Sequence, residues 1–463
     1  MRKMDARFLP HNTHLEEPAA FIQLDPHLRQ LNKLPLVHRS KLISRLSRLN
    51  TGIYTISGGR QVGKTTLLKQ WMAQLIKDAI DPGTIAFVTG ELIDDHHSLI
   101  RVISEVLNEM PRERLKYLIV DEVTYIKDWD KGVKYLADAG LLENVVLVLT
   151  GSDLIIIREA RMRFPGRRGQ SETVDFHIYP LSFRECVKLK SNFTPYEFSR
   201  FEDLSADPSA GLMNRLFIEF DSYLAHGGFL TAINDFAQHQ QILTATFSTY
   251  SDWIRGDVLK RNKSENYLLE ILGAIIIRYG SQLTWNALAG DLSIDHPKTI
   301  ADYIELLASM DAVFVQSAIR EDKLTAAPKK AKKVVFTDPF IFHAVNFWLN
   351  PVDDPFSKQL KPVLTDQQWS SKLTEACTAT HYRRIFPTFY IKAKGEVDVA
   401  YVNENRLWPV EVKWTRQLRP KQLKQIVKYP NGRILTRSKV KGEIHGVPTE
   451  PLPLALLRLG ELQ

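Results

Sequence analysis

The stretch "ISGGRQVGKTTLLKQ", residues 56–70, carries glycines and a lysine at a spacing that suits phosphate binding. Gly58 and Gly63 let the backbone curl so that successive N–H groups point inward at an anion. Lys64 can reach the β- and γ-phosphates, and the Thr65 hydroxyl can ligate Mg²⁺. The sequence therefore predicts a site for ATP and Mg²⁺. The residues expected to bind the nucleotide are Gly58, Gly59, Gly63, Lys64, Thr65, Thr66 and Ser152.

Two acids end an apolar run in "YLIVDE". Asp121 lies where a strand-end carboxylate reaches the Mg²⁺ shell, together with Thr65. Glu122 can polarise the attacking water as a general base. The presence of both acids favours ATP hydrolysis over nucleotide binding alone.

Hydroxyl residues end a further apolar run, "VVLVLTGSD". Thr150 or Ser152 can contact the γ-phosphate or the attacking water there, and an ordinary strand-end turn is the alternative.

The loop "RMRFPGRRGQ" that follows is basic. Arg167 is the candidate for a catalytic arginine, because phosphoryl transfer develops negative charge that a rigid cation stabilises. Arg163 and Arg168 compete for that role, and a solvated basic loop is the alternative. Such an arginine can act within its own subunit or on a neighbouring copy, so a homo-oligomer is among the expected partners.

A second group of chemically capable residues lies in "GEVDVAYV" and "LWPVEVKW". If these runs are adjacent strands, Asp398, Glu411 and Lys413 converge on one face. Carboxylates hold a hard divalent ion, and a lysine can orient or deprotonate water bound to it. Glu375, from a preceding helix, can add a third carboxylate. The set predicts a phosphodiester-cleaving site, with a cross-strand ion pair on an exposed sheet face as the alternative.

The basic charge of the chain is concentrated near this second group. The net charge is +8, and residues 411–441 hold ten Lys and Arg against one acidic residue. A basic surplus confined to one segment favours a polyanion partner such as DNA. A solvated helix face is the alternative.

The pattern of elements predicts an α/β protein whose N-terminal part has a parallel sheet with flanking helices, because apolar strands alternate with amphipathic helices. Its strands are expected at residues 52–57, 84–90, 115–122 and 144–152. The predicted domains are an N-terminal extension (1–36), a P-loop ATPase domain (37–190), a helical connector (191–262), a winged-helix domain (263–348) and a nuclease-like α/β domain of restriction-endonuclease type (349–463).

The predicted winged helix places "HPKTIADYIELLASM" as its second motif helix and "AAPKKAKK" as the tip between two strands. Lys298, Asp302 and Glu305 on that helix give it mixed charge, which is unfavourable for reading the DNA major groove. A protein-binding or packing role is therefore open beside DNA readout. The lysines of the tip can contact phosphate.

Length and composition predict several domains and a cellular compartment. A chain of 463 residues is too long for one ordinary core, so several domains are expected. Its two cysteines, Cys186 and Cys377, are far apart, which favours a reducing compartment. The apolar runs are shorter than the roughly 20 residues that span a bilayer. We expect a cytoplasmic protein without a membrane partner.

From about His38 to Thr436 the chain resembles the AAA-superfamily (archaeal-type) ATPases of bacteria and archaea that carry a C-terminal PD-(D/E)xK-like domain. The resemblance rests on the order and spacing of motifs. They are "GGRQVGKTTLL", "YLIVDEVTYIKDWD", "VVLVLTGSDL", "FPGRRG", "YPLSFREC", "YLAHGGF", "KTIADYIELLASMDAVF", "KKVVFTDPFIF" and "GEVDVAYV…WPVEVK".

The resemblance implies roles for particular residues. Arg167 corresponds to the arginine of the family's "GR" motif. The phosphate loop and Asp121 are implied to bind Mg-ATP, and Asp398, Glu411 and Lys413 to form the nuclease-fold signature. The chain departs from the family at Leu230, where proline is frequent, and at Val399, where an aromatic residue is typical.

Three functions remain in competition at this stage. The first is an ATPase whose nucleotide state is coupled to DNA through the winged-helix and nuclease-like region. The second is an ATP-dependent signalling switch whose inactive nuclease-like domain binds a protein partner. The third is a metal-dependent nuclease regulated by ATP.

Overall fold

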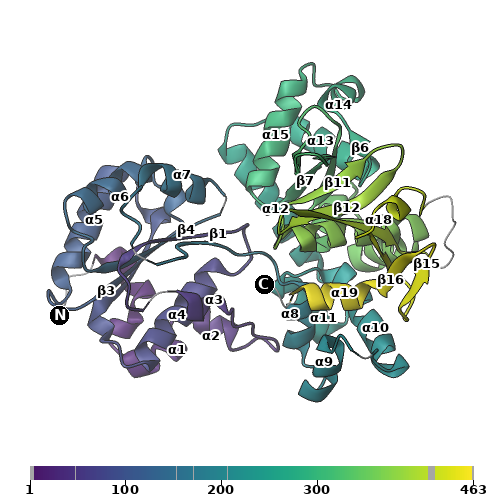
Figure 1. Cartoon of the computed structure of the whole chain (residues 1–463). Coiled ribbons are helices and arrows are strands. Elements are labelled where there is room, and N and C mark those ends of the chain that lie inside the picture. Colours follow the sequence, from purple (N-terminus) through teal and green to yellow (C-terminus); the bar gives the residue numbers. More distant parts are fainter. Residues whose placement is uncertain are drawn as a thin grey trace. The chain divides into compact units, whose positions relative to one another are not determined.

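The computed structural model describes residues 5–46, 48–152, 154–169, 171–205, 207–415 and 423–460. The chain divides into two compact units, Met1–Tyr179 and Pro180–Gln463, and Figure 1 shows their elements. Part of the expected basic segment, residues 416–422, lies outside the described residues. Among the helices of the described ranges, none has the length and apolar character needed to cross a membrane.

The N-terminal unit is built on a five-stranded sheet in the order β2-β3-β4-β1-β5, and every neighbouring pair is parallel. The strands are β1 (Gly52–Ser57), β2 (Ile85–Thr89), β3 (Lys116–Asp121), β4 (Val145–Gly151) and β5 (Asp175–His177). Their apolar runs are buried on both faces, as the strands of a parallel sheet covered by helices are. The expected parallel sheet with flanking helices is therefore confirmed.

Helices cover both faces of this sheet (Figure 1). One apolar cluster joins the sheet to α5 (His96–Glu109) and α6 (Trp129–Asp138), and another joins it to α4 (Lys64–Lys77). Because β4 lies between β1 and β3 and is parallel to both, the carboxyl ends of the three strands lie side by side at one end of the sheet. The loop after β1, the acids after β3 and the hydroxyl residues after β4 are thereby brought together.

The N-terminal segment, expected to be an extension, packs against this sheet. Phe8, Phe21 and Leu28 are buried in its two clusters. The Asn12 side chain donates to the Phe87 carbonyl at 2.7 Å and accepts from the Phe87 N–H at 2.8 Å, so it pairs with the edge strand β2 like a further strand residue. The segment consists of 3₁₀ turns and very short helices, which leave no helical period in the sequence.

A buried ion pair fastens the same segment to the helix of the phosphate loop. Lys69 on α4 and Asp25 are both fully buried, and the Lys69 Nζ lies 2.9 Å from Asp25 Oδ2. Lys69 also donates to the His11 carbonyl at 2.6 Å. Removing one member of a buried pair typically costs about 3–5 kcal/mol. The segment is thus structurally part of the N-terminal unit.

The C-terminal unit begins with helices and then forms a small antiparallel sheet. Its first helices are α8 (Phe183–Lys190), α9 (Pro195–Glu202), α10 (Ala210–His226), α11 (Leu230–His239) and α12 (Thr244–Lys260). The next elements are α13 (Glu265–Ile277), β6 (Gln282–Leu283), α14 (Trp285–Asp291), α15 (Pro297–Ser309), β7 (Val313–Ser317) and β10 (Lys332–Phe336). The sheet order is β6-β10-β7, and the hairpin of β8 (Ile319–Arg320) and β9 (Thr325–Ala326) lies between β7 and β10 in the chain.

The remaining elements form a mixed sheet in the order β11-β12-β13-β14-β16-β15. They are α16 (Pro339–Leu349), α17 (Lys361–Thr365), α18 (Gln367–Arg383), β11 (Thr388–Lys392), β12 (Glu396–Asn403), β13 (Arg406–Lys413), β14 (Arg433–Thr436), β15 (Gly442–Ile444), β16 (Val447–Pro451) and α19 (Leu452–Leu459). The C-terminal helix α19 packs on α8, α9, α10 and α18, so the end of the chain returns to the start of this unit.

Three sequence motifs of the C-terminal unit meet at one tight contact. The Leu181 N–H donates to the Gly228 carbonyl at 2.8 Å, and the Gly228 N–H donates to Asp338 Oδ2 at 2.8 Å. A Cβ on Gly228 would lie 2.0 Å from the Leu181 carbonyl oxygen, and one on Gly227 would lie 1.7 Å from Asp338 Oδ1. The paired glycines of "AHGGF" are therefore required by backbone approach.

Burial raises the pKa of Asp338 to about 6, from an ordinary value of 3.8. The folded state then holds this proton more tightly than the unfolded chain, so the stabilisation is present below about pH 4 and is lost as the pH rises through about 6. Between about pH 4 and pH 6, we expect the free energy of unfolding of the wild type to fall by up to about 3 kcal/mol relative to that of Asp338→Asn. Urea unfolding at several pH values measures the difference, and a pH-independent difference would contradict it.

Candidate functional site

The phosphate loop has the backbone geometry that an anion requires. Gly58 has a φ of 155° and Gly63 a φ of 91°, which side-chain-bearing residues rarely adopt. A Cβ on Gly58 would also lie 2.4 Å from the Ile178 carbonyl oxygen. Helix α4 begins at Lys64, and within the described ranges no side chain caps its first turn. The N–H groups of Thr65 and Thr66 in that turn therefore suit phosphate oxygens.

The Lys64 ammonium lies folded back over this loop. It donates to the Gly58 and Gly59 carbonyls, each at 3.0 Å, and is 5% exposed. Its Nζ also lies 3.4 Å from Glu122 Oε1 and 3.5 Å from Ser152 Oγ. The charge of the buried Lys64 is thus compensated by the Glu122 carboxylate, which follows β3.

Asp121 is held between two threonine hydroxyls. Thr65 Oγ1 donates to Asp121 Oδ2 at 2.6 Å, and Thr150 Oγ1 donates to Asp121 Oδ1 at 2.5 Å. Burial raises the pKa of Asp121, and the two hydroxyl donors oppose that rise. A carboxylate and a hydroxyl in contact are the oxygen ligands that Mg²⁺ prefers. Thr65 and Asp121 therefore fit the expected metal ion.

Glu122 occupies a strained position beside Asp121. Its φ is 51°, in the left-handed region that is costly for a residue other than glycine. Ser152 Oγ lies 2.6 Å from both carboxylate oxygens of Glu122, and the Glu122 N–H donates to Thr150 Oγ1 at 2.9 Å. The two hydroxyl side chains therefore bond to different carboxylates: Thr150 donates to Asp121, and Ser152 donates to Glu122.

The three candidate arginines lie on other partners. Arg167 pairs with Asp138, and Arg163 lies 3.1 Å from Asp130 Oδ2. Arg168 pairs with Asp175 and also donates to Thr55 Oγ1 at 3.3 Å, so it ties β1 to β5. Among the contacts of the described residues, none joins these arginines to Lys64, Asp121 or Glu122.

The C-terminal unit gathers the residues of the second predicted group. Asp398 on β12 accepts from the Val412 N–H at 2.9 Å, and Lys413 Nζ lies 2.5 Å from Glu411 Oε1 and 3.9 Å from Asp398 Oδ2. Burial, reinforced by the Asp398 charge, raises the pKa of Glu411 and that of Glu375 above their ordinary value of 4.5.

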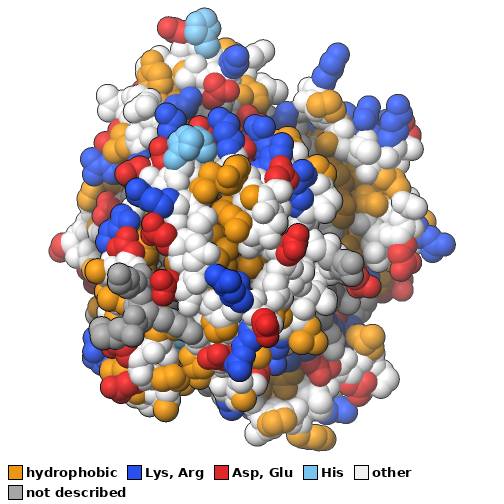
Figure 2. All heavy atoms as spheres, turned by 90° about the vertical axis from the view of Figure 1, so that its left-hand side faces the viewer, with side chains coloured by type: hydrophobic (Ala, Val, Ile, Leu, Met, Phe, Trp, Pro, Cys, Tyr) orange, Lys and Arg blue, Asp and Glu red, His pale blue; other side chains and the backbone are white. Residues whose placement is uncertain are grey.

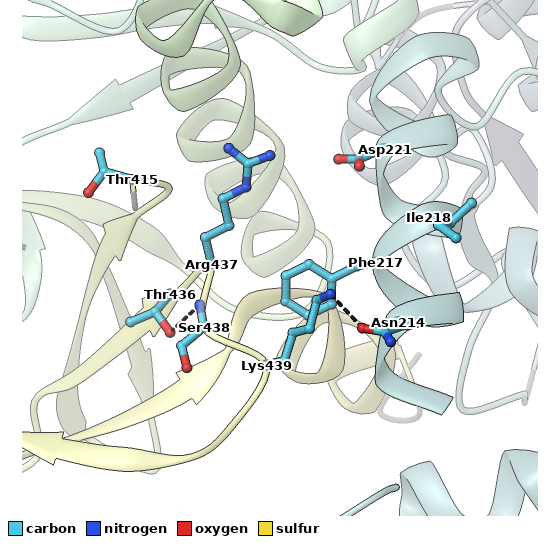
Figure 3. Close-up of a pocket in the computed structure, with 9 residues that line it drawn as sticks. All are labelled: Asn214, Phe217, Ile218, Asp221, Thr415, Thr436, Arg437, Ser438 and Lys439. Carbon is cyan, nitrogen blue, oxygen red and sulfur yellow. Dashed lines mark hydrogen bonds between the residues drawn. The ribbon is translucent and has the colours of Figure 1, made fainter. Parts of the chain in front are cut away.

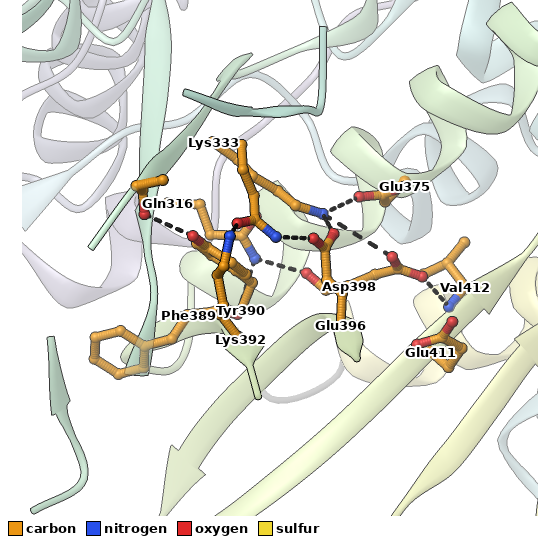
Figure 4. A network of polar contacts seen from close by, with 12 residues as sticks. Gln316, Lys333, Glu375, Phe389, Tyr390, Lys392, Glu396, Asp398, Glu411 and Val412 are labelled. Carbon is orange, nitrogen blue, oxygen red and sulfur yellow. Dashed lines mark hydrogen bonds and ion pairs between the residues drawn. The ribbon is translucent and has the colours of Figure 1, made fainter. Parts of the chain in front are cut away.

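Lys333 on β10 lies at the centre of this group, although its sequence context predicts an exposed tip. Its ammonium lies 2.7 Å from Glu375 Oε1, in contact with Glu396, and 4.0 Å from Asp398 Oδ1 (Figure 4). Burial lowers the pKa of Lys333, but the three carboxylates outweigh burial and raise it above its ordinary value.

Of the lysines expected at the tip between two strands, Lys332 and Lys333 lie on β10. Lys333 is only 2% exposed, so it cannot reach DNA. Lys330 Nζ donates to the Lys392 carbonyl at 3.1 Å, and Lys332 Nζ donates to the Pro328 carbonyl at 3.1 Å. Phosphate contact by the exposed Lys329 and Lys330 stays a prediction.

A pocket of about 690 Å³ lies between α10 and the loop after β14 (Figure 3). Phe217 stacks on Trp414 with ring centroids 5.8 Å apart, and the Arg437 guanidinium lies 5.4 Å from the centroid of the Trp414 ring. Lys439 Nζ lies 2.5 Å from Asn214 Oδ1 at the same pocket. The Arg437 N–H donates to the Lys413 carbonyl at 3.2 Å, so the pocket adjoins the second group.

Comparison with known proteins gives the class of the N-terminal unit. Residues 50–187 match the family model described as an AAA domain, and residues 218–351 match a domain of unknown function. An uncharacterized protein of Methanocaldococcus jannaschii, MJ1544, is 24% identical over 395 residues, which are 81% of this chain and 78% of that protein. A second protein of that organism, MJ1637, is 28% identical over 139 residues, covering 29% of this chain and 27% of its own length.

Two solved structures are also similar. The Walker-type ATPase PABY2304 of Pyrococcus abyssi is 13% identical and covers 66% of this chain and 95% of its own, with a TM-score of 0.43. Cdc6p from Pyrobaculum aerophilum is 13% identical and covers 75% of this chain and 96% of its own, with a TM-score of 0.24. The family match and the site geometry together define residues 50–187 as an AAA-type P-loop ATPase domain, a nucleotide-binding fold.

The position of Thr150 predicts a selective effect on metal-dependent binding. Thr150→Val removes the hydroxyl that holds Asp121, so we expect the affinity for Mg-ATP to fall about 10-fold or more. The affinity for ATP in EDTA should not change, and Thr150→Ser should restore Mg-ATP binding. Titration with a fluorescent ATP analogue measures both, and an equal loss with and without Mg²⁺ would contradict the assignment.

Proposed function

We propose that the protein is an Mg-ATP-dependent ATPase whose nucleotide state is coupled to its C-terminal unit. The observation that carries the proposal is the convergence of Lys64, Thr65, Asp121 and Glu122 at the carboxyl ends of the strands. The hydroxyls of Thr150 and Ser152 bond to the two acids there. Mg²⁺, when held by Thr65 and Asp121, would neutralise phosphate charge.

The chain's own residues supply the remaining chemistry. Lys64 would exchange its loop carbonyls for phosphate oxygens, since these are the stronger acceptors for an ammonium. That movement would release Glu122 from the lysine charge while Ser152 keeps it oriented. Glu122 can then accept a proton from the attacking water. Arg167 stays the candidate for transition-state stabilisation, within its own subunit or on a neighbouring copy.

DNA is the proposed partner of the C-terminal unit. The order α13, β6, α14, α15, β7 and β10, with the β8–β9 hairpin between the last two strands, supports a winged helix. The sheet that carries Asp398, Glu411 and Lys413 supports a nuclease-like fold. Arg437 and Lys439 line an open pocket beside this sheet, where phosphate oxygens would find cations. On the face shown in Figure 2, which is the left-hand side of Figure 1, acidic and basic side chains are intermixed, so that face is a less favourable surface for DNA.

A second candidate is an ATP-dependent switch that binds a protein partner through an inactive nuclease-like domain. Lys333 among the carboxylates favours it, because an ammonium there competes with a metal ion. The acidic Asp302 and Glu305 on α15 favour it as well, because they would repel DNA phosphates. DNA cleavage regulated by ATP is the third candidate, and Lys333 weighs against it.

The ATPase proposal predicts separate effects for two site residues. Lys64→Ala should lower ATP turnover by about 100-fold or more, because it removes the cation nearest the phosphates. Glu122→Gln should retain Mg-ATP binding and lose turnover, because it removes only the base. The control is Lys77→Ala, at the exposed end of α4. A phosphate-release assay with and without duplex DNA measures the rates. Turnover that survives Lys64→Ala would contradict the proposal.

DNA binding predicts a dependence on salt that two residues control. Arg437→Ala combined with Lys439→Ala should reduce the slope of log affinity against log salt by about 2, which is roughly one unit for each phosphate contact. Lys358→Ala is the control, because Lys358 pairs with Asp353 at 2.6 Å. Fluorescence anisotropy with duplex DNA measures the slope. An unchanged slope would remove this pocket from the interface, and absence of binding at low salt would favour the protein-binding switch.

A further inference from the structure

The strands β6, β10 and β7 carry one row of polar side chains toward the mixed sheet. In the sheet register, Lys333 on β10 lies opposite Gln282 on β6 and Gln316 on β7. Gln316 is 2% exposed and donates to the Phe389 carbonyl at 2.8 Å and the Asp398 carbonyl at 2.9 Å. Gln282 contacts Glu396 and Lys392. The row therefore fixes the small sheet against β11 and β12.

The middle member of this row lies where a divalent ion would have to bind. Carboxylate oxygens of Glu375, Glu396 and Asp398 lie within 4.8 Å of one another, a spacing that could surround one ion. The Lys333 ammonium fills that space, as Figure 4 shows. Since an ion bound to the same oxygens would stand next to a buried like charge, the ammonium and a metal exclude each other.

Two further residues, Glu411 and Tyr390, lie beside this centre. Glu411 is 4% exposed, and its Oε2 has no hydrogen-bond partner among the described residues. The hydroxyl of Tyr390, whose ring centroid lies 5.5 Å from Lys333 Nζ, donates to the Ala331 carbonyl at 2.6 Å and so fastens the approach to β10. Because the Lys333 ammonium lies among Glu375, Glu396 and Asp398, these three carboxylates do not fit a resident metal ion while Lys333 is in place.

We propose that Lys333 is the resident cation of the Glu375–Glu396–Asp398 centre, so that the protein binds no divalent ion there and removal of Lys333 creates a divalent-cation site. The Lys333 ammonium, a charge that is covalently part of the chain, takes the place of an exchangeable metal ion. It thereby makes the packing of β10 on the mixed sheet independent of metal supply. This inference does not rest on ATP hydrolysis or on DNA binding.

The test measures Mn²⁺ binding by the full-length chain without nucleotide. All proteins carry Asp121→Asn, which removes the carboxylate of the ATP-site metal, so a failure of the ATPase proposal leaves the readout intact. Lys333→Met should bind one additional Mn²⁺ per chain by electron paramagnetic resonance, and its melting temperature should rise with Mn²⁺. The chain with Lys333 and the Lys332→Met control should show neither effect.

A second variant covers the case in which Lys333→Met alone does not fold. Lys333→Met with Glu375→Gln buries one carboxylate fewer and keeps Glu396 and Asp398 as ligands, so it should also gain Mn²⁺. The proposal is overturned if the chain with Lys333 binds Mn²⁺ and loses it on Glu396→Gln, because Glu396 belongs to this centre and not to the Asp398–Glu411–Lys413 group. It is equally overturned if neither Lys333 variant gains Mn²⁺.

Discussion

A buried ammonium requires carboxylates beside it, and this constraint organises both units of the protein. Lys69 and Asp25 join the N-terminal segment to α4, while Lys64 lies near Glu122 across the phosphate site. In the C-terminal unit, Lys333 lies among three carboxylates. Desolvating a charge costs several kcal/mol, so each of these lysines fixes the position of the element that carries its partner. The three lysines differ in whether a ligand can displace their carboxylate partners. A nucleotide can compete with Glu122 for Lys64, whereas Lys69 and Lys333 are enclosed by side chains.

The phosphate site could be predicted from sequence because its parts are local. Gly58, Gly63 and Lys64 lie within one loop, and an apolar run ending in Asp121 shows by itself where a strand stops. The parallel sheet followed from alternation of strands and helices. The choice between Thr150 and Ser152 could not be made, because it depends on how the end of β4 is placed against β3, which the sequence of neither strand specifies.

The missed features depend on contacts between distant segments. Lys333 sits in a lysine-rich run that resembles a solvated tip, and only the packing of β10 against β12, more than 60 residues later, makes it a buried residue. The N-terminal segment lacks a period because its turns are short, and its burial depends on the edge of β2. Its pairing with the Phe87 backbone is made by a side-chain amide, for which no sequence pattern exists.

The pairing of Asn12 with Phe87 also affects what can pair with the edge strand β2. An edge strand with free N–H and C=O groups is a template on which another strand can add, which leads to aggregation. The Asn12 amide supplies a donor and an acceptor in the geometry of a strand and occupies that position with a single side chain. Phe8 and Phe21 bury apolar surface around it. The segment thus covers this part of the β2 edge, so that another strand cannot pair with Phe87 there.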